Sequence, residues 1–361
     1  MYYTYIIYKN KIITPCDKMA LDICMASDDN FAIHLGISII SIMENNDSDI
    51  NVHILNDKIS QINIDRLKTI EERYPGLNLY FYDIHKYFKE NDVNYIFNET
   101  LKDNDFFNLL GISTFSRLFL EDIIPKDIEK ILYLDCDTVV LNDLNELFAI
   151  ELDENLIAGV IDIMANINKH FYKGQEKKTP FINAGVLLIN LRKWRELKFA
   201  KLSIDLLNKY PDKSFLNDQN IINILCGEDV IIMDPKFNTM SEFFYVDYEK
   251  NLKINEHFAS VERFYNPTLV ENALKNPTIV HFLSQVWDRP WMSQIGLFKH
   301  SPKNPYNESY LHYKSLSPWK DEPIQENTKN FTQKAYYEAI RFIMMHFPAN
   351  ILANLFDLKN R

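Results

Sequence analysis

Strand-like and helix-like segments alternate near the start of the chain. Residues 21–26 form an apolar run that predicts a buried strand, and residues 31–43 place Ile33, Ile37 and Ile40 on one helix face. The alternation continues with a predicted strand at 50–55, a helix at 59–74 and a strand at 77–82. Because parallel strands are joined by helical crossovers, this rhythm predicts an α/β fold with a mostly parallel sheet flanked by helices.

A later apolar run, ILYLDCDTVV at residues 131–140, is interrupted by Asp135 and Asp137. Side chains alternate along a strand, so both aspartates should project to one side and Cys136 to the other. Neighbouring carboxylates repel each other unless a positive charge lies between them, and a divalent cation with oxygen ligands meets that need. The run therefore predicts a metal site. The alternative is a strand end whose aspartates cap a turn.

Other polar residues stand at the predicted ends of strands. Asp28 ends the first strand, and a predicted helix at 113–121 carries Arg117. Ligands of wound parallel sheets bind beyond the carboxyl ends of the strands, so Asp28 and the aspartate pair should border one crevice crossed by that helix. Three later segments bring further candidates: a strand at 156–163 with Asp162, a small-residue turn and strand at 181–190 with Asn183, and a strand at 278–282 with His281.

Composition and charge narrow the classes of function. The chain has 361 residues, 47% of them hydrophobic and 13% aromatic, which is enough for a substantial core. Eight glycines, with no GxGxxG or GxxxxGK[ST] pattern, argue against a glycine-rich phosphate loop. The net charge of −11 argues against a nucleic-acid partner, and a phosphate-bearing substrate would need a cation and local arginines to offset it.

The cysteines and the N-terminal residues bear on the compartment. Cys16, Cys24, Cys136 and Cys226 show no zinc-like spacing, so reduced thiols in the cytosol are expected. Residues 1–20 are apolar but broken by charges, and they lack the apolar core of a signal peptide. The sequence therefore predicts a cytoplasmic protein.

Six segments occur in an order that is similar to a known family. They are ASDDNF at 26–31, STFSRL at 113–118, ILYLDCDTVV at 131–140, FINAGVLLINLRKW at 181–194, NDQN at 217–220, and HF with RPW within 281–291. Together they resemble glycosyltransferase family 8, in particular the bacterial lipooligosaccharide galactosyltransferases and glucosyltransferases. The resemblance covers roughly residues 20–295. A lone DxD would carry little weight, whereas six ordered motifs are specific.

The resemblance implies a GT-A fold, a UDP-sugar donor, Mn²⁺ with Mg²⁺ as the alternative, and retention of the anomeric configuration. It implies that Asp135, Asp137 and His281 are the metal ligands. Two carboxylates and an imidazole form a site slightly softer than Mg²⁺ prefers, which favours Mn²⁺. UDP-galactose and UDP-glucose both stay open as donors, and the expected acceptor is a glycan or glycolipid of lipooligosaccharide or capsule type.

The resemblance also assigns residues around the donor and the acceptor. Those implied at the nucleotide are Ala26, Asp28, Asn30, Thr114, Arg117, Asp135, Cys136, Asp137 and Arg289. Those implied at the donor sugar and acceptor are Asp162, Asn183, Asp218 and Gln219, although Asn217 and Asp218 could be no more than a helix cap. The run from Leu283 to Arg289 departs from the family because it lacks a glycine and has arginine where lysine is usual. Arginine can still hold a pyrophosphate through two parallel hydrogen bonds.

The residue types indicate how retention would be achieved. Retention needs either a carboxylate nucleophile or attack on the same face as the leaving group. Gln219 stands where a nucleophile is expected, and an amide is a poor nucleophile, so same-face attack is favoured, with the β-phosphate oxygen taking the acceptor's proton. Two alternatives remain open: a haloacid-dehalogenase-type phosphatase, and a nucleotide-sugar-binding subunit without turnover.

The expected organisation is an N-terminal extension at 1–18, a catalytic domain at 19–300 and a helical C-terminal region at 301–361. The last region contains an amphipathic segment at 331–356 that Pro348 interrupts. From Lys329 onward, five basic residues stand against two acidic ones. This excess of positive charge indicates peripheral docking on the inner face of the cytoplasmic membrane. Packing on protein is the alternative.

Overall fold

The computed structural model describes residues 7–8, 11–12, 20–91, 93, 105–163, 180–209, 217–245, 265–283, 289–292, 304–326 and 329–346. Among these residues, no helix is both long enough and apolar enough to cross a membrane.

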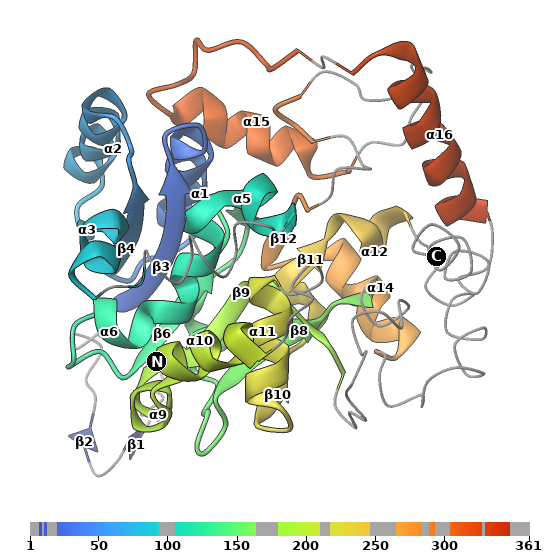
Figure 1. Cartoon of the computed structure of the whole chain (residues 1–361). Coiled ribbons are helices and arrows are strands. Elements are labelled where there is room, and N and C mark those ends of the chain that lie inside the picture. The colour runs from blue at the N-terminus through green and yellow to red at the C-terminus, as the bar shows by residue number, and fades with distance from the viewer. Residues whose placement is uncertain are drawn as a thin grey trace.

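A seven-stranded sheet forms the centre of the fold (Figure 1). Its strands, in spatial order, are β10 (Val230–Ile232), β8 (Ile157–Ile161), β9 (Ile182–Asn190), β6 (Lys130–Leu134), β3 (Leu21–Asp28), β4 (Ile50–Asp57) and β5 (Leu77–Asp83). All neighbours pair in parallel except β9, which is antiparallel to both β6 and β8. The predicted mostly parallel sheet is therefore confirmed, with one reversed strand inside it.

A smaller sheet lies beside the large one and receives the chain after the aspartate pair. It consists of β11 (Thr239–Met240), β12 (Ile279–His281) and β7 (Thr138–Val140), with β12 in the middle. A separate antiparallel pair is formed by β1 (Ile7–Tyr8) and β2 (Lys11–Ile12). Residues 131–140 thus supply strands to two different sheets, and the prediction of one continuous strand is wrong.

Alternating residues of the central strands belong to two hydrophobic clusters, one on each face of the sheet. On β6, Leu132 and Leu134 belong to one cluster, whereas Ile131 and Tyr133 belong to the other. The first face is covered by α1 (Ala32–Glu44), α2 (Gln61–Arg73) and α15 (Asn307–Leu316). The second is covered by α3 (Ile84–Glu90), α6 (Leu120–Ile123), α9 (Leu191–Leu197), α10 (Phe199–Lys209) and α11 (Asp218–Cys226).

The predicted helix at 113–121 is broken into three pieces. They are the end of α5 (Asp105–Ser116), the 3-10 turn η1 (Arg117–Phe119) and the short helix α6. Shorter elements complete the described fold: α7 (Asn145–Phe148), η3 (Pro235–Asn238), α12 (Ser241–Tyr245), α14 (Pro267–Lys275) and α16 (Phe331–His346). The tighter turn at η1 directs Arg117 into the interior, where it is 5% exposed.

The segment that follows α15 is tied to the first helices of the fold. Gly36 on α1 has no side chain, and the Trp319 indole occupies the space, so that an added Cβ would lie 2.4 Å from the ring. Trp319 Nε1 also donates to Asn63 on α2 at 3.2 Å, and Arg66 pairs with Glu322 at 2.7 Å. Residues 304–326 are thereby packed on α1 and α2, while α16 lies at the edge of the molecule (Figure 1).

Candidate active site

Asp135 and Asp137 lie in a tight turn between β6 and β7. The Asp135 backbone N–H donates to the Gly185 carbonyl at 2.8 Å, and the Phe282 N–H donates to the Asp137 carbonyl at 2.9 Å. Strand alternation therefore does not explain why both carboxylates face one point. The turn does, because it is fixed between the large and the small sheet, and the alternative of aspartates in a turn at a strand end describes the backbone correctly.

Cys136, between the two aspartates, faces the other way and is buried. Its thiol donates to the Ala26 carbonyl at 3.2 Å, which joins the aspartate turn to the end of β3. Burial raises the pKa of this thiol well above its ordinary value, so it stays protonated. The expectation that Cys136 points away from the aspartates is confirmed, and the residue serves to dock the turn.

His281 completes a cluster with the two aspartates. Its Nε2 lies 3.1 Å from Asp137 Oδ1 and 3.9 Å from Asp135 Oδ2. The three residues each offer one ligand atom, and these atoms lie within 4.8 Å of one another. His281 ends β12 in the small sheet, so its position does not follow from the carboxyl edge of the large sheet. The donor set of two carboxylates and one imidazole suits a divalent transition-metal cation.

Gly185 provides the space in which this cluster sits. A Cβ at Gly185 would lie 2.2 Å from His281 Cε1 and 2.8 Å from Asp135 Oδ2, closer than non-bonded contacts of a Cβ atom allow. The residue thus lets β9 pass directly beneath the imidazole and the carboxylate. The cluster fits a cation in charge and in donor type, and it depends on a glycine at this position.

The pKa values of Asp137 and His281 are shifted by the attraction between their opposite charges. Burial opposes the charge of Asp137, yet His281 and Arg289 hold the pKa of its carboxyl well below its usual range. Burial likewise opposes a charge on His281, but Asp137 and Asp135 outweigh it and raise the pKa of the ring. The Asp137 carboxylate is therefore ionised and available to a cation at neutral pH.

Arg117 lies below the aspartate turn and is fully engaged by protein atoms. Its guanidinium donates to Asp135 Oδ1 at 2.8 Å and to the Ala184 carbonyl at 2.7 Å. Its Nε contacts Asp218 Oδ2 at 3.1 Å and the Thr114 carbonyl at 3.1 Å. Burial raises the pKa of Asp218, while Arg117 opposes that rise. Arg117 thus orients Asp135 and Asp218.

Asp162, Asn183 and Gln219 form a hydrogen-bonded group beside this pair. Gln219 Oε1 accepts from Asn183 Nδ2 at 3.2 Å and from the Ala184 N–H at 3.0 Å. Gln219 Nε2 donates to Asp162 Oδ2 at 3.0 Å. Asn217 is the N-cap of α11, accepting from Asn220 N–H at 2.8 Å, so the capping interpretation holds for Asn217. Asp218 instead pairs with Arg117.

The turn after β3 brings the remaining candidates to the same edge. Asp28 ends β3 and accepts from the Phe31 N–H at 2.8 Å, and Asn30 Nδ2 donates to Asp28 Oδ2 at 3.2 Å. Arg289 lies over the Trp291 ring, 5.4 Å from its centroid. Residues 284–288 of the run that departs from the family pattern lie outside the described residues.

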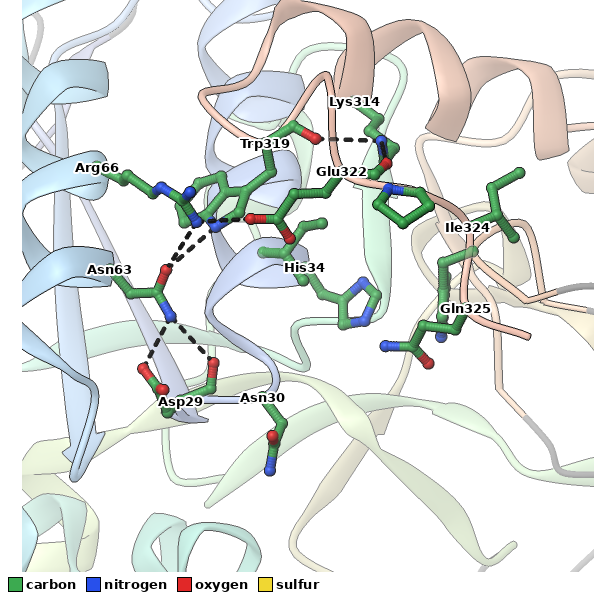
Figure 2. A pocket seen from close by; sticks show the side chains of 13 residues that line it. Asp29, Asn30, His34, Asn63, Arg66, Lys314, Trp319, Glu322, Ile324 and Gln325 are labelled. Carbon is green, nitrogen blue, oxygen red and sulfur yellow. Dashed lines mark hydrogen bonds and ion pairs between the residues drawn. The ribbon is translucent and has the colours of Figure 1, made fainter. Parts of the chain in front are cut away.

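A hollow of about 230 Å³ adjoins this turn (Figure 2). Asp29 and Asn30 border it on one side, α2 on another, and residues 314–325 of the C-terminal segment on the third. Figure 2 shows the ring of His34, which belongs to α1, extending from that helix toward the C-terminal segment. His34 Nδ1 and the Tyr310 hydroxyl lie 2.7 Å apart. The family motifs all precede this segment, so no motif predicted its place beside the turn.

Comparisons with known proteins agree with this geometry. The pattern that defines glycosyl transferase family 8 matches residues 22–294. The chain belongs to glycosyltransferase family 8. A putative glycosyltransferase of Haemophilus influenzae is 34% identical over 60% of this chain, which spans 63% of that relative. The lipopolysaccharide 1,2-glucosyltransferase of Escherichia coli is 25% identical over 90% of this chain and 87% of its own.

A solved structure identifies the fold. The galactosyltransferase LgtC, in complex with donor and acceptor sugar analogs, superposes with a TM-score of 0.63 at 24% identity. The match covers 82% of this chain and 96% of LgtC. The predicted GT-A fold is therefore confirmed. Family membership leaves the phosphatase alternative without support.

Two residues of the candidate active site were not singled out from the sequence. Gly185 stood within the segment at 181–194, but nothing local marks it as the residue beneath the candidate metal cluster. Asn238, which contacts His281, follows an ordinary Pro-Lys-Phe stretch and belongs to no motif. Both act through partners distant in sequence, so only the folded chain reveals them.

Proposed function

We propose that this family 8 enzyme is a metal-dependent, retaining hexosyltransferase that moves galactose or glucose from a UDP-sugar to a glycan or glycolipid acceptor. The convergence of Asp135, Asp137 and His281 carries the proposal. The three groups would hold Mn²⁺, and Mg²⁺ is the alternative. A bound cation supplies a positive charge that stabilises the departing diphosphate.

The protein's own groups would prepare the donor and acceptor. Asp28, Asn30 and Arg289 border the edge where a nucleotide would lie, and Arg117 keeps Asp135 in place from below. Gln219, Asp162 and Asn183 hold one another and would orient the hydroxyls of the donor sugar or acceptor. The limited freedom of this group suits positioning, which supplies a large part of enzymatic rate enhancement.

The expected chemistry is same-face substitution at the anomeric carbon. The acceptor oxygen forms a bond to that carbon while the bond to the β-phosphate oxygen breaks, and the acceptor's proton passes to a β-phosphate oxygen. UDP leaves with the electron pair of the broken bond. The amide of Gln219 is a poor nucleophile and already donates to Asp162 and accepts from the Ala184 N–H, which supports a single displacement.

The position of α16 supports a membrane-proximal acceptor. Phe331 is 71% exposed and Phe342 is 56% exposed, and three helical turns separate them, so they lie on the same face. We infer that this face docks on the cytoplasmic surface of the membrane, where a lipid-linked acceptor would be presented. The competing proposal is that this face of α16 packs on another protein. Sedimentation with liposomes, described in the Discussion, distinguishes the membrane from the protein.

A screen of UDP-sugars for UDP release tests the proposed function. The purified chain is incubated with each donor with Mn²⁺, with Mg²⁺ and with a chelator, and Asp135→Asn serves as the matched variant. We expect release from UDP-galactose or UDP-glucose with Mn²⁺, and loss of release with chelator or in Asp135→Asn. Full activity of that variant, or indifference to chelator, would exclude the metal role. No release from any donor would favour a binding subunit without turnover.

A further inference from the structure

Asn238 stands between the candidate metal ligand His281 and the group formed by Asp162, Asn183 and Gln219. It is the last residue of η3, and its side chain is completely buried. Its Oδ1 lies 3.1 Å from His281 Nδ1, and its Nδ2 donates to Asn183 Oδ1 at 2.9 Å.

The orientation of the Asn238 amide follows from its neighbours. Asn183 Oδ1 also accepts from the Gly185 N–H at 2.9 Å, and Asn183 Nδ2 donates to Gln219 Oε1 at 3.2 Å. Asn183 therefore offers only its oxygen to Asn238, which must answer with its NH₂ group. The Asn238 oxygen is then the atom that faces His281, an assignment made from the network of donors and acceptors.

This orientation selects the tautomer of His281. An amide oxygen only accepts, so the Nδ1 of His281 must carry a proton to complete the hydrogen bond. With the Nδ1 proton held by Asn238, a cation between His281, Asp135 and Asp137 would take the place of the Nε2 proton and meet the lone pair of that nitrogen, as a metal-binding imidazole requires. Partners of this kind fix the ring orientation and raise the basicity of ligating histidines in other metal sites.

The backbone around Asn238 is held at several points. Thr239 and Met240 form β11, which pairs in parallel with β12, and Met240 stands opposite His281. The Thr239 hydroxyl donates to the Pro235 carbonyl at 3.1 Å across η3. Asn238 thus directly precedes β11, and the pairing of β11 with β12 keeps the Asn238 amide in register with the His281 ring.

We propose that Asn238 is a positioning residue that fixes His281 for metal binding and couples the metal centre to Asn183. The proposal rests on the metal site of the proposed function. Hydrogen bonds run without interruption from Asp137 through His281, Asn238 and Asn183 to Gln219. Loss of Asn238 should therefore weaken metal binding directly and disturb the sugar-facing group through Asn183.

Mn²⁺ titration of the full chain without donor, followed by electron paramagnetic resonance, tests the proposal. Asn238→Leu removes both hydrogen bonds at similar volume and should bind Mn²⁺ about 10- to 100-fold more weakly. Asn238→Asp keeps an acceptor for His281 but loses donation to Asn183. That variant should bind Mn²⁺ within about 3-fold of the unmodified chain while its kcat falls by about 10-fold or more, with KM for the donor less affected.

Thr239→Val is the matched control, because it removes the neighbouring hydrogen bond to Pro235 and leaves the Asn238 amide intact. It should bind Mn²⁺ as the unmodified chain does. Unchanged Mn²⁺ affinity in Asn238→Leu, with Asp137→Asn losing it, would overturn the role of Asn238 and leave the metal site standing. If Asn238→Leu does not fold, an unchanged kcat in Asn238→Asp would overturn the proposed positioning role of Asn238. An unmodified chain that binds no Mn²⁺ refutes the metal site and this role together.

Discussion

Arg117 Nη2 lies 2.8 Å from Asp135 Oδ1, in a part of the protein where the arginine side chain is almost completely buried. The same guanidinium contacts Asp218 at 3.1 Å, so one cation pairs with two carboxylates from different elements. Arg117 further stacks on Tyr133, 4.3 Å from the ring centroid. Arg117 therefore supports the aspartate turn from the protein interior.

Replacement of Arg117 should destabilise the fold. Arg117→Met leaves Asp135 and Asp218 without their buried partner, which should lower the free energy of unfolding by about 3–5 kcal/mol. Arg117→Lys keeps the charge, but one ammonium cannot reach all the acceptors of the guanidinium, so its loss should be smaller. Urea denaturation of the metal-free chain measures both.

The control for this series is Arg192→Met, because Arg192 pairs with Glu196 at the surface of α9. Exposed pairs of this type contribute little, so the urea midpoint should barely change. Equal stability of Arg117→Met and the unmodified chain would mean that the buried pairing does not organise the turn.

Gly185→Ala should abolish metal binding. The added methyl would overlap His281 and Asp135, and both residues would have to move apart. We expect Mn²⁺ affinity to fall by about 100-fold or more and Mn²⁺-dependent UDP release to be lost with it. Calorimetric titration with Mn²⁺ checks the first effect without dependence on a substrate.

Gly36→Ala provides the comparison, since its added methyl overlaps the Trp319 ring and no residue of the metal cluster. It should lower the melting temperature by several degrees through displacement of the C-terminal segment, with Mn²⁺ affinity retained. If both glycine variants lose metal binding to the same degree, general destabilisation explains the result.

Gln219→Ala should lower turnover by about one to two orders of magnitude, a loss of roughly 1.4–2.8 kcal/mol in transition-state stabilisation. Gln219 holds Asn183 and Asp162 in place, so its removal should loosen the group that these three residues form without removing a nucleophile. Steady-state kcat with the preferred donor is the measurement. A loss of about 10⁵-fold, or a trapped covalent adduct, would instead indicate double displacement.

Local periodicity was sufficient to predict the first half of the fold. The strands β3, β4 and β5 and the helices between them follow from apolar spacing, since each element is covered by its sequence neighbours. Strand direction was not predictable at β9, because an apolar run reads the same in either orientation. The change from the large to the small sheet at 135–137 was not predictable for a related reason. Val139 and Val140 are as deeply buried as the apolar residues of β6, although they belong to the small sheet.

In the candidate site, too, some residues could be predicted from the sequence and others could not. The aspartate pair and the start of α11 stand out because several polar residues interrupt apolar sequence within a few positions. Gly185 and Asn238 acquire their importance from His281, about 100 and 43 residues away in sequence, respectively, and spacing alone does not encode such contacts. The sequence was enough to propose the candidate metal ligands, whereas the residues that shape and orient them could be found only from the fold.

Acid should destabilise the protein through His34. Burial lowers the pKa of His34 to about 4, a shift that nearby Asp137 opposes and Arg289 supports. The unfolded chain binds this proton at about pH 6.5, so between pH 6.5 and 4 the unfolded state holds more protons and stability falls as pH falls. The loss should approach about 3 kcal/mol at the lower end. Urea denaturation at pH 7.5 and pH 5 measures it.

His34→Gln tests the assignment, because the amide can still contact the Tyr310 hydroxyl without taking up a proton. Its stability should change less between the two pH values than that of the unmodified chain. His312→Gln, at an exposed position of α15, should show the unmodified pH dependence. An identical acid sensitivity in all three proteins would assign the effect to other groups.

Removal of residues 329–361 should abolish binding to anionic liposomes while Mn²⁺-dependent UDP release persists. The described part of this segment combines the exposed rings of Phe331, Tyr336 and Phe342 with Lys334 on α16, a pattern suited to an anionic membrane surface. Sedimentation with vesicles of phosphatidylglycerol and phosphatidylcholine, at low and high salt, measures the binding. Phe342→Ser in the full chain is the point variant, and it should weaken sedimentation without changing UDP release. If the full-length protein never sediments with the vesicles, α16 is a packing element, and the membrane proposal is wrong.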